Sequence, residues 1–352
     1  MSGCSKENRM IHFDVLRILA AFSVVMLHSS AQFWYTLEVD STQWVIANSY
    51  NAVFRFGVPI FVMISGALFL APDYRLDVKR LYKHNILRLC AIYAVWSCVY
   101  GWKDCLGFGL KITDVKPILR EMLSGRYHLW FLPMIVGIYM LLPILKSWIT
   151  HAEKKNIQYF LGLFVVLQVG KETLRALTVT DELHGILNLV QIEMVCSYVG
   201  YFVLGYYLAH VGIGEKLRKA IYISVLPAMV CNIVFGTLMV QKYGRGGYLV
   251  YDSYGLFTFF IVTALFLFTV KNIPGSNMGK AGQAVIKEIS ADTMGIYVMH
   301  ICLMELTENT GFQSMMLPNI IGIPVYAIAC FVICMIFAAL LRRIPLIGKY
   351  IC

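Results

Sequence analysis

Long apolar runs recur along this chain, and that recurrence constrains its fold more than any other feature. The first run begins near residue 11 and the last ends near residue 341. Of all residues, 59% are hydrophobic and only 14% are charged, whereas about a quarter of the residues of a soluble domain carry a charge. Since a membrane-spanning helix needs roughly 20 apolar residues, the sequence predicts an integral membrane protein.

We expect about ten spans, so the predicted fold is an all-α polytopic bundle of transmembrane helices. The fifth and ninth runs are the weakest, because each is shorter than a full span. All loops are short and no internal repeat is visible, so residues 1–352 are expected to form a single domain. The predicted spans are 11–34, 49–71, 85–102, 127–145, 156–172, 187–210, 219–240, 252–270, 290–306 and 320–341.

The distribution of basic residues predicts the orientation of the bundle. With the N-terminus in the cytoplasm and ten spans, about twice as many Lys and Arg residues fall on the cytoplasmic side as on the outer side. This bias favours an N-in, C-in topology. It also accounts for the net charge of +10 without a nucleic-acid partner. The apolar run after the start MSGCSKENRM lacks a small-residue cleavage site, so we expect it to remain as the first span.

The 10 cysteines show no CxxC pair and no spacing typical of metal ligands. We therefore expect free thiols and no bound metal. The residues that stand out are instead the ionisable ones inside the apolar runs. A charge within hydrocarbon costs several kcal/mol, so such residues normally face the bundle interior or water. They are Asp14, Arg17, His28, Arg55, His128, Glu193, Asp292 and His300.

The first span carries three of these residues on one face. Asp14 and Arg17 are three residues apart and therefore adjacent on a helix surface. Arg17 and His28 are eleven apart, close to three whole turns or about 16 Å along one face. A structural ion pair plus a hydrogen-bonded histidine is one interpretation. Three ionisable groups on one stripe favour the other interpretation, a functional site.

Five segments in order resemble the membrane-bound acyltransferase 3 family. The first is FDVLRILAAFSVVMLH, in which an Arg, ten residues and a His match that family's first-helix signature at Arg17 and His28. The others are FRFGVPIFVMISGALFL (54–70), HLWFLPMIVGIYMLLPIL (128–145), VGYFVLGYYLA (199–209) and GIYVMH (295–300). The resemblance covers nearly the whole chain. The chain also resembles the membrane domain of serine racemases linked to vancomycin resistance.

The resemblance implies a bacterial inner-membrane enzyme that moves an acyl group, usually acetyl, from cytoplasmic acyl-CoA to a hydroxyl of a cell-envelope glycan or a small-molecule acceptor. A hydroxyl is a poor nucleophile until a base takes its proton, and an imidazole can do so near neutral pH. His28 is the expected general base, supported by Arg17 and Asp14. The lipid bilayer and acyl-CoA are the expected partners, and the oligomeric state, a homodimer included, is left open.

The basic segment YRLDVKRLYKHNILRL (74–89) is the expected landing site for the phosphates of CoA. Positive-inside topology explains the same charges equally well. The family often has Arg-x-x-Arg at the start of the third helix, and this chain has Asn85 in place of the first Arg. That departure leaves a second hypothesis, a transporter of a small polar solute such as serine. The candidate CoA ligands are Arg80, Lys83, His84 and Arg88.

The remaining candidates are expected to line the acceptor site. Arg55 either binds an anionic acceptor or pairs with Glu193. The carboxyl group of Glu193 is expected to relay protons, to pair with Arg55 or to stay neutral. His128 opens the fourth span beside Trp130, which either belongs to an interfacial aromatic belt or stacks on a sugar ring. Tyr297 and His300 match the family's late-helix motif and are expected to contact the acceptor or act as a second acid–base pair.

Overall fold

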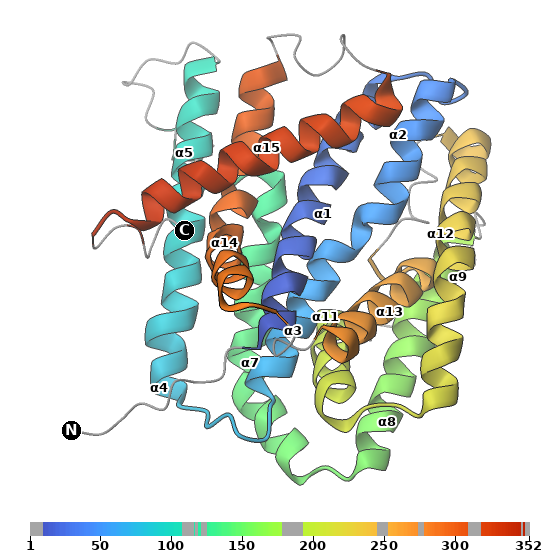
Figure 1. Ribbon diagram of the computed structural model, residues 1–352, viewed down its shortest axis with the longest axis vertical. Helices are drawn as coiled ribbons and strands as arrows, with labels where there is room; N and C mark the ends of the chain where they lie inside the picture. Colours follow the sequence, from blue (N-terminus) through green and yellow to red (C-terminus); the bar gives the residue numbers. More distant parts are fainter. Residues whose placement is uncertain are drawn as a thin grey trace. The chain divides into compact units, whose positions relative to one another are not determined.

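The computed structural model describes residues 10–107, 116, 119–120, 125–177, 193–244, 253–273, 278–308, 318–345 and 348 (Figure 1), although the side chains of residues 106, 107, 177 and 193–196 are outside that description. Within these ranges the fold is helical and contains no strand. The all-α prediction is therefore confirmed.

Within the described residues, each of the ten predicted spans coincides with a helix or with a run of consecutive helical segments, while residues 187–192 of the sixth span and 252 of the eighth lie outside that description. In chain order these are α1 (Ile11–Thr36); α2 (Thr42–Val53), η1 (Phe54–Phe56) and α3 (Gly57–Phe69); α4 (Val78–Arg80), η2 (Leu81–Ile86) and α5 (Leu87–Gly107); η3 (Tyr127–Trp130) and α7 (Phe131–His151); α8 (Lys154–Leu163), η4 (Phe164–Val169) and α9 (Gly170–Leu177); α11 (Glu193–Tyr206) and η5 (Tyr207–Val211); α12 (Glu215–Tyr243); α13 (Leu256–Asn272); α14 (Lys280–Glu308); and α15 (Asn319–Arg342).

Six of these helices or runs are long and apolar enough to cross a membrane, as judged over the described residues. They are Ile11–Thr36, Thr42–Phe69, Tyr127–His151, Glu215–Tyr243, Lys280–Glu308 and Asn319–Arg342. The ninth predicted span, 290–306, is short because only the second half of the observed helix α14 is apolar. α14 in fact starts ten residues earlier and has 29 residues. The N-in orientation stays a prediction.

The contacts within the chain divide it into two compact units. The first consists of residues 1–23, 52–67 and 163–293, and the second of residues 24–51, 68–162 and 294–352. We call them unit 1 and unit 2. Helices α1 and α14 are each divided between the two units, α1 after residue 23 and α14 after residue 293. The single-domain expectation stays a prediction.

Unit 1 is held by very close helix packing at glycines. A Cβ added to Gly66 of α3 would clash with the backbone of Phe202 in α11, and one added to Gly205 of α11 would clash with the backbone of Met63 in α3. Small residues at helix contacts allow this backbone approach in membranes, where the gain comes from van der Waals packing. These contacts of Gly66 and Gly205, which we call the glycine seam, lie within residues 54–70 and 199–209, two of the segments that resemble family helices.

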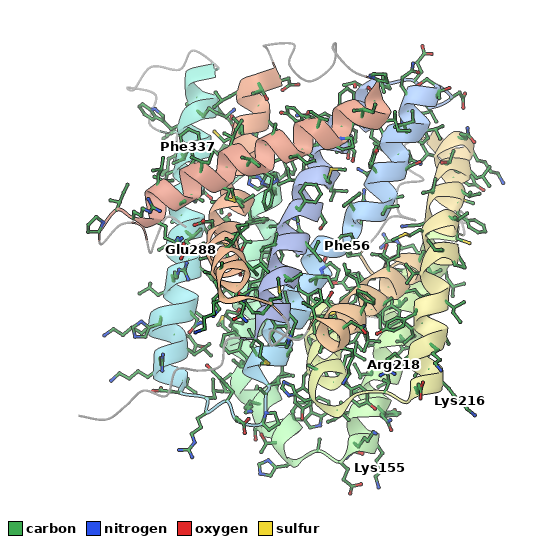
Figure 2. All side chains as sticks on the ribbon, viewed as in Figure 1. Phe56, Lys155, Lys216, Arg218, Glu288 and Phe337 are labelled. Carbon is green, nitrogen blue, oxygen red and sulfur yellow. The ribbon has the colours of Figure 1, made fainter. Side chains whose placement is uncertain are left out.

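Unit 2 is crossed by the last helix of the chain. Figure 1 shows α15 running across the upper part of α14. The two helices meet where the hydroxyls of Tyr326 and Thr307 lie 2.7 Å apart and where Sγ of Cys330 lies 3.8 Å from the carbonyl oxygen of His300. The opposite face of α15 is apolar and exposed, as at Phe337, which is 56% exposed and is labelled in Figure 2. That pattern suits contact with lipid.

Candidate functional site

A short 3₁₀ turn before α7 separates a buried histidine from two exposed aromatics. Gly125 has a φ of 65°, a left-handed conformation that glycine adopts without strain. Arg126 is then extended, and η3 begins at Tyr127. In this turn His128 is 2% exposed, whereas Tyr127 is 61% and Trp130 is 45% exposed. The turn therefore directs one imidazole inward and keeps its aromatic neighbours accessible.

Three histidines from three helices converge in unit 2. The ring centroid of His300 on α14 lies 5.2 Å from that of His28 on α1 and 5.2 Å from that of His128 on η3. Tyr297 lies one turn before His300 on α14, with its ring centroid 5.8 Å from that of His128, and its hydroxyl donates a hydrogen bond to the backbone carbonyl of His128. We call the rings of His28, His128 and His300 the imidazole cluster.

The hydrogen bonds of His300 fix the tautomer of its neutral ring. Its Nδ1 lies 2.7 Å from the backbone carbonyl oxygen of Tyr297. A carbonyl oxygen only accepts hydrogen bonds, so Nδ1 carries the proton and Nε2 of the neutral ring carries a lone pair. That Nε2 is fully buried and has no hydrogen-bond partner among the described residues. A lone pair held in this way can accept a proton from a bound hydroxyl group.

Other buried polar atoms near the cluster also lack protein partners within the described residues. Both ring nitrogens of His128 make no hydrogen bond of normal geometry, and neither does Oε1 of Gln32, one turn beyond His28 on α1. The hydroxyl of Ser97 on α5 is in the same state. Buried polar groups are nearly always hydrogen-bonded in native proteins, so such a concentration indicates a site that binds a polar ligand. Over the described residues, no group of three or more His, Cys, Asp and Glu has the geometry to hold a metal ion.

Asp14 and Arg17 form a separate polar site in unit 1. The Nη1 of Arg17 donates to Oδ1 of Asp14 at 2.9 Å, as the spacing of three residues on one helix predicted. The hydroxyl of Ser290 on α14 donates to the same Oδ1 at 2.7 Å. Asp14 is fully buried, and the Arg17 side chain is 27% exposed. The acid–base pair is therefore real, and its carboxylate also receives a hydroxyl from another helix.

Arg55 and Glu193 also belong to unit 1. Arg55 lies in η1, the 3₁₀ segment between α2 and α3, and is half-buried. Glu193 is the first residue of α11, and its side chain lies outside the described part of the chain. Their proposed pairing and their role in the site stay predictions.

The predicted CoA ligands lie on the helical run that begins at α4. Asp77 starts this run, because its side chain accepts a hydrogen bond from the backbone N–H of Arg80 at 3.1 Å. The following segment, η2, is a π-helix, a form that is rare and often found at functional sites. The candidate ligands Arg80, Lys83 and His84 are exposed and Arg88 is half-buried. All four lie on one helical run of unit 2.

Several residues of these sites were not singled out by the sequence. Tyr100 and Ser97 lie in an apolar stretch of α5 that looks lipid-facing, and Arg126 looks like an ordinary basic loop residue. Arg126 pairs with Asp104, where Nη1 and Oδ2 lie 2.8 Å apart, and also with Glu305. These partners are 22 and 179 residues away in the chain, so no local pattern predicts them.

The chain is a helical membrane protein, and two imidazoles of its cluster, those of His128 and His300, are buried. It belongs to the acyltransferase 3 family, because the model of that family, described as an acyltransferase domain, matches residues 10–339. The resemblance inferred from the five segments is therefore confirmed, and in this general sense the chain is a membrane acyltransferase. No curated protein matches the chain, and no solved structure matches it.

Proposed function

We propose that this protein is an O-acyltransferase that moves an acetyl group from cytoplasmic acetyl-CoA, or another acyl group from its acyl-CoA, to a hydroxyl of a cell-envelope glycan or similar acceptor in a bacterial plasma membrane. The observation that carries the proposal is the imidazole cluster, in which the half-buried ring of His28 meets the buried rings of His128 and His300. Among the described residues, both ring nitrogens of His128 and Nε2 of His300 make no hydrogen bond of normal geometry. Membership of an acyltransferase family supports it.

The proposed reaction uses the cluster for proton transfer. An imidazole of the cluster, His28 in our assignment, takes the proton of the acceptor hydroxyl as its oxygen attacks the thioester carbonyl carbon. The carbon–sulfur bond then breaks, and the proton passes to the thiolate of CoA. Nε2 of His300 holds a lone pair in the neutral ring and is assigned to share that proton, since the ring centroids of His300 and His28 lie 5.2 Å apart. His128 is assigned to the acceptor or to the developing negative charge on oxygen.

The donor is proposed to bind at the run from Arg80 to Arg88. CoA carries several phosphates, which Lys and Arg bind through charge-assisted hydrogen bonds. The run offers Arg80, Lys83, His84 and Arg88 without the family's first Arg at position 85. The exposed guanidinium and ammonium groups on two successive turns support this assignment, and the π-helical turn at Lys83 and His84 adds to it.

The acceptor is proposed to be a sugar hydroxyl. Tyr127 and Trp130 are exposed on the same short turn that buries His128, and the Tyr127 ring centroid lies 5.6 Å from that of His28. Flat aromatic faces beside a proton-accepting group suit a pyranose ring, whose C–H face stacks on aromatics while its hydroxyls point sideways. Arg55 and Glu193 are assigned to the acceptor path, and Asp14 and Arg17 to support of the first helix.

The test is binding and turnover of acetyl-CoA by the purified protein in nanodiscs. We expect saturable binding of acetyl-CoA and release of CoA that accelerates when a glycan acceptor is added. Binding that persists without any CoA release from a panel of glycans would contradict the acceptor class. Well-folded protein that does not bind acetyl-CoA at millimolar concentration would contradict the acyltransferase proposal and favour transport of a polar solute, for which serine uptake into proteoliposomes is the next assay.

A further inference from the structure

The hydroxyl of Tyr100 is inserted into the backbone of a neighbouring helix. It donates to the carbonyl oxygen of Val298 at 2.8 Å and accepts from the N–H of Cys302 at 2.9 Å. These two groups are four residues apart on α14, the pair that an α-helix joins directly. Tyr100 belongs to α5 and is only 1% exposed. A buried side chain from another helix thus bridges one turn of α14, a known cause of local helix distortion.

The bridged turn is the one that carries His300. Residues 298 to 302 lie on either side of it, and the ring of His300 already uses the carbonyl of Tyr297 in the preceding turn. The ring of Tyr100 also touches the imidazole cluster directly. Its centroid lies 5.1 Å from that of His128, edge to face at 77°. One side chain therefore contacts the backbone that places His300 and the ring of His128.

Tyr100 is in turn held by a group of half-buried charges. The guanidinium carbon of Arg126 lies 6.0 Å from the centroid of the Tyr100 ring, within the range of a cation–π contact. Arg126 pairs with Asp104 at 2.8 Å and with Glu305, and Lys103 pairs with Glu305 at 2.7 Å. Asp104 is one helical turn after Tyr100, so α5, α14 and the start of η3 are joined beside the cluster.

We propose that Tyr100 is a positioning residue for the imidazole cluster. Its hydroxyl holds the α14 turn that places His300, and its ring fixes the orientation of His128. In the alternative, Tyr100 only fastens α5 to α14. Removing the hydroxyl would then lower stability without changing the histidine rings. The catalytic part of the proposal rests on the proposed function, whereas the effect on the rings does not.

The test uses Tyr100→Phe, which keeps the ring and removes the bridge, in nanodisc protein with ¹⁵N-labelled histidine. The signals of His128 and His300 are assigned from their Asn variants. We expect the ring-nitrogen signals of both to shift and change their pH dependence, while that of the exposed His151 stays fixed. The control is Tyr159→Phe, because Tyr159 is 69% exposed on α8. It should shift none of these signals.

Turnover gives the second measurement. Small misplacements of catalytic groups cost large factors in rate, so we expect Tyr100→Phe to lower kcat about tenfold and to leave KM for acetyl-CoA within twofold. Unchanged histidine signals with a lowered melting temperature would overturn the proposal in favour of a fastening role. If the wild-type protein shows no turnover, the proposed function fails while the histidine signals still decide the positioning role.

A second variant covers the case in which Tyr100→Phe does not fold. Arg126→Lys keeps the charge beside Tyr100 but loses the planar fork that pairs with two carboxylates at once. We expect a shift of the His128 signal and none at His151. An Arg126→Lys protein that folds and leaves the His128 signal in place would contradict the proposal on its own.

Discussion

Two buried polar sites of this molecule differ in how completely their atoms are hydrogen-bonded. In unit 1 the carboxylate of Asp14 accepts from both Ser290 and Arg17. In unit 2 the imidazole cluster keeps both ring nitrogens of His128 and one of His300 without partners among the described residues. Both sites draw on α1 and α14, so helix identity does not explain the difference.

The difference separates a stabilising site from a reactive one. A buried polar group without a partner costs about 1–3 kcal/mol, so several of them in one place favour a site that a ligand or water completes. A carboxylate with two donors costs little and holds helices together. We therefore expect changes in the imidazole cluster to affect turnover more than stability. Changes at Asp14 and in the glycine seam of unit 1 should do the reverse.

The largest effect is expected for His28→Ala. Removing a general base typically slows a reaction by about 10²–10⁴-fold, so CoA release should fall by that factor. The melting temperature in nanodiscs should change little. The matched control is His151→Ala, because His151 is an exposed histidine on α7 whose Nδ1 lies 2.8 Å from the carbonyl oxygen of Ser147 in the same helix. If His28→Ala keeps its turnover with a verified acceptor, His28 is not the general base.

The next largest effect is expected for Gly66→Ala in unit 1. The added methyl group would meet the backbone of Phe202, which cannot move aside as a side chain can. Overpacking of this kind costs about 1–3 kcal/mol, to be measured as a lower unfolding temperature. Gly137→Ala on α7 is the control, since nothing lies within 4 Å of a Cβ there. Equal unfolding temperatures for the two variants would show that the seam is looser than described.

A smaller loss of stability is expected for Asp14→Asn. The amide keeps an oxygen for Ser290 but loses the charge that pairs with Arg17, a change worth about 1 kcal/mol. Turnover should stay within about threefold, because the site is a support. Lys219→Ala is the control, as it breaks the exposed pair with Glu215 at 2.9 Å and should cost under about 0.5 kcal/mol. If Asp14→Asn protein is stable but loses turnover a hundredfold, the Asp14 site takes part in the reaction and does not only stabilise the fold.

The smallest effect is expected for Arg88→Ala, measured as KM for acetyl-CoA. Losing one of several charge-assisted contacts should raise KM about threefold at low salt and less at high salt. Lys155→Ala is the control, because Lys155 at the start of α8 has a side chain that is 75% exposed and pairs with the exposed Glu153 (Figure 2). If both variants raise KM equally, the run from Arg80 to Arg88 is a topological charge cluster and not a CoA site.

Sequence patterns predicted the helices well because membrane spans have a strong local signal. Apolar runs gave every helical run in the right order, and the three-residue spacing of Asp14 and Arg17 gave their ion pair. The Arg–His spacing and the late-helix motif pointed to His28, Tyr297 and His300. The structure adds that all three lie with His128 in unit 2, and their chemical roles stay predictions.

Long-range partners were not predictable, because their signals are not local. Ser290 is a small polar residue at the start of the predicted span 290–306, and only its place beside Asp14, 276 residues away in the chain, makes it informative. Tyr100 is an aromatic residue in an apolar helix, where a lipid contact is the ordinary expectation. Its hydroxyl became meaningful only once Val298 and Cys302 were placed on either side of it.

The glycine seam between α3 and α11 has a consequence for the surrounding bilayer. Where a single methyl group would already collide with a backbone, a hydrocarbon tail, several ångströms wide, has no passage. No lipid tail can therefore pass between α3 and α11 at Gly66 and Gly205. A fatty chain dissolved in the membrane would have to enter the protein at some place other than the glycine seam.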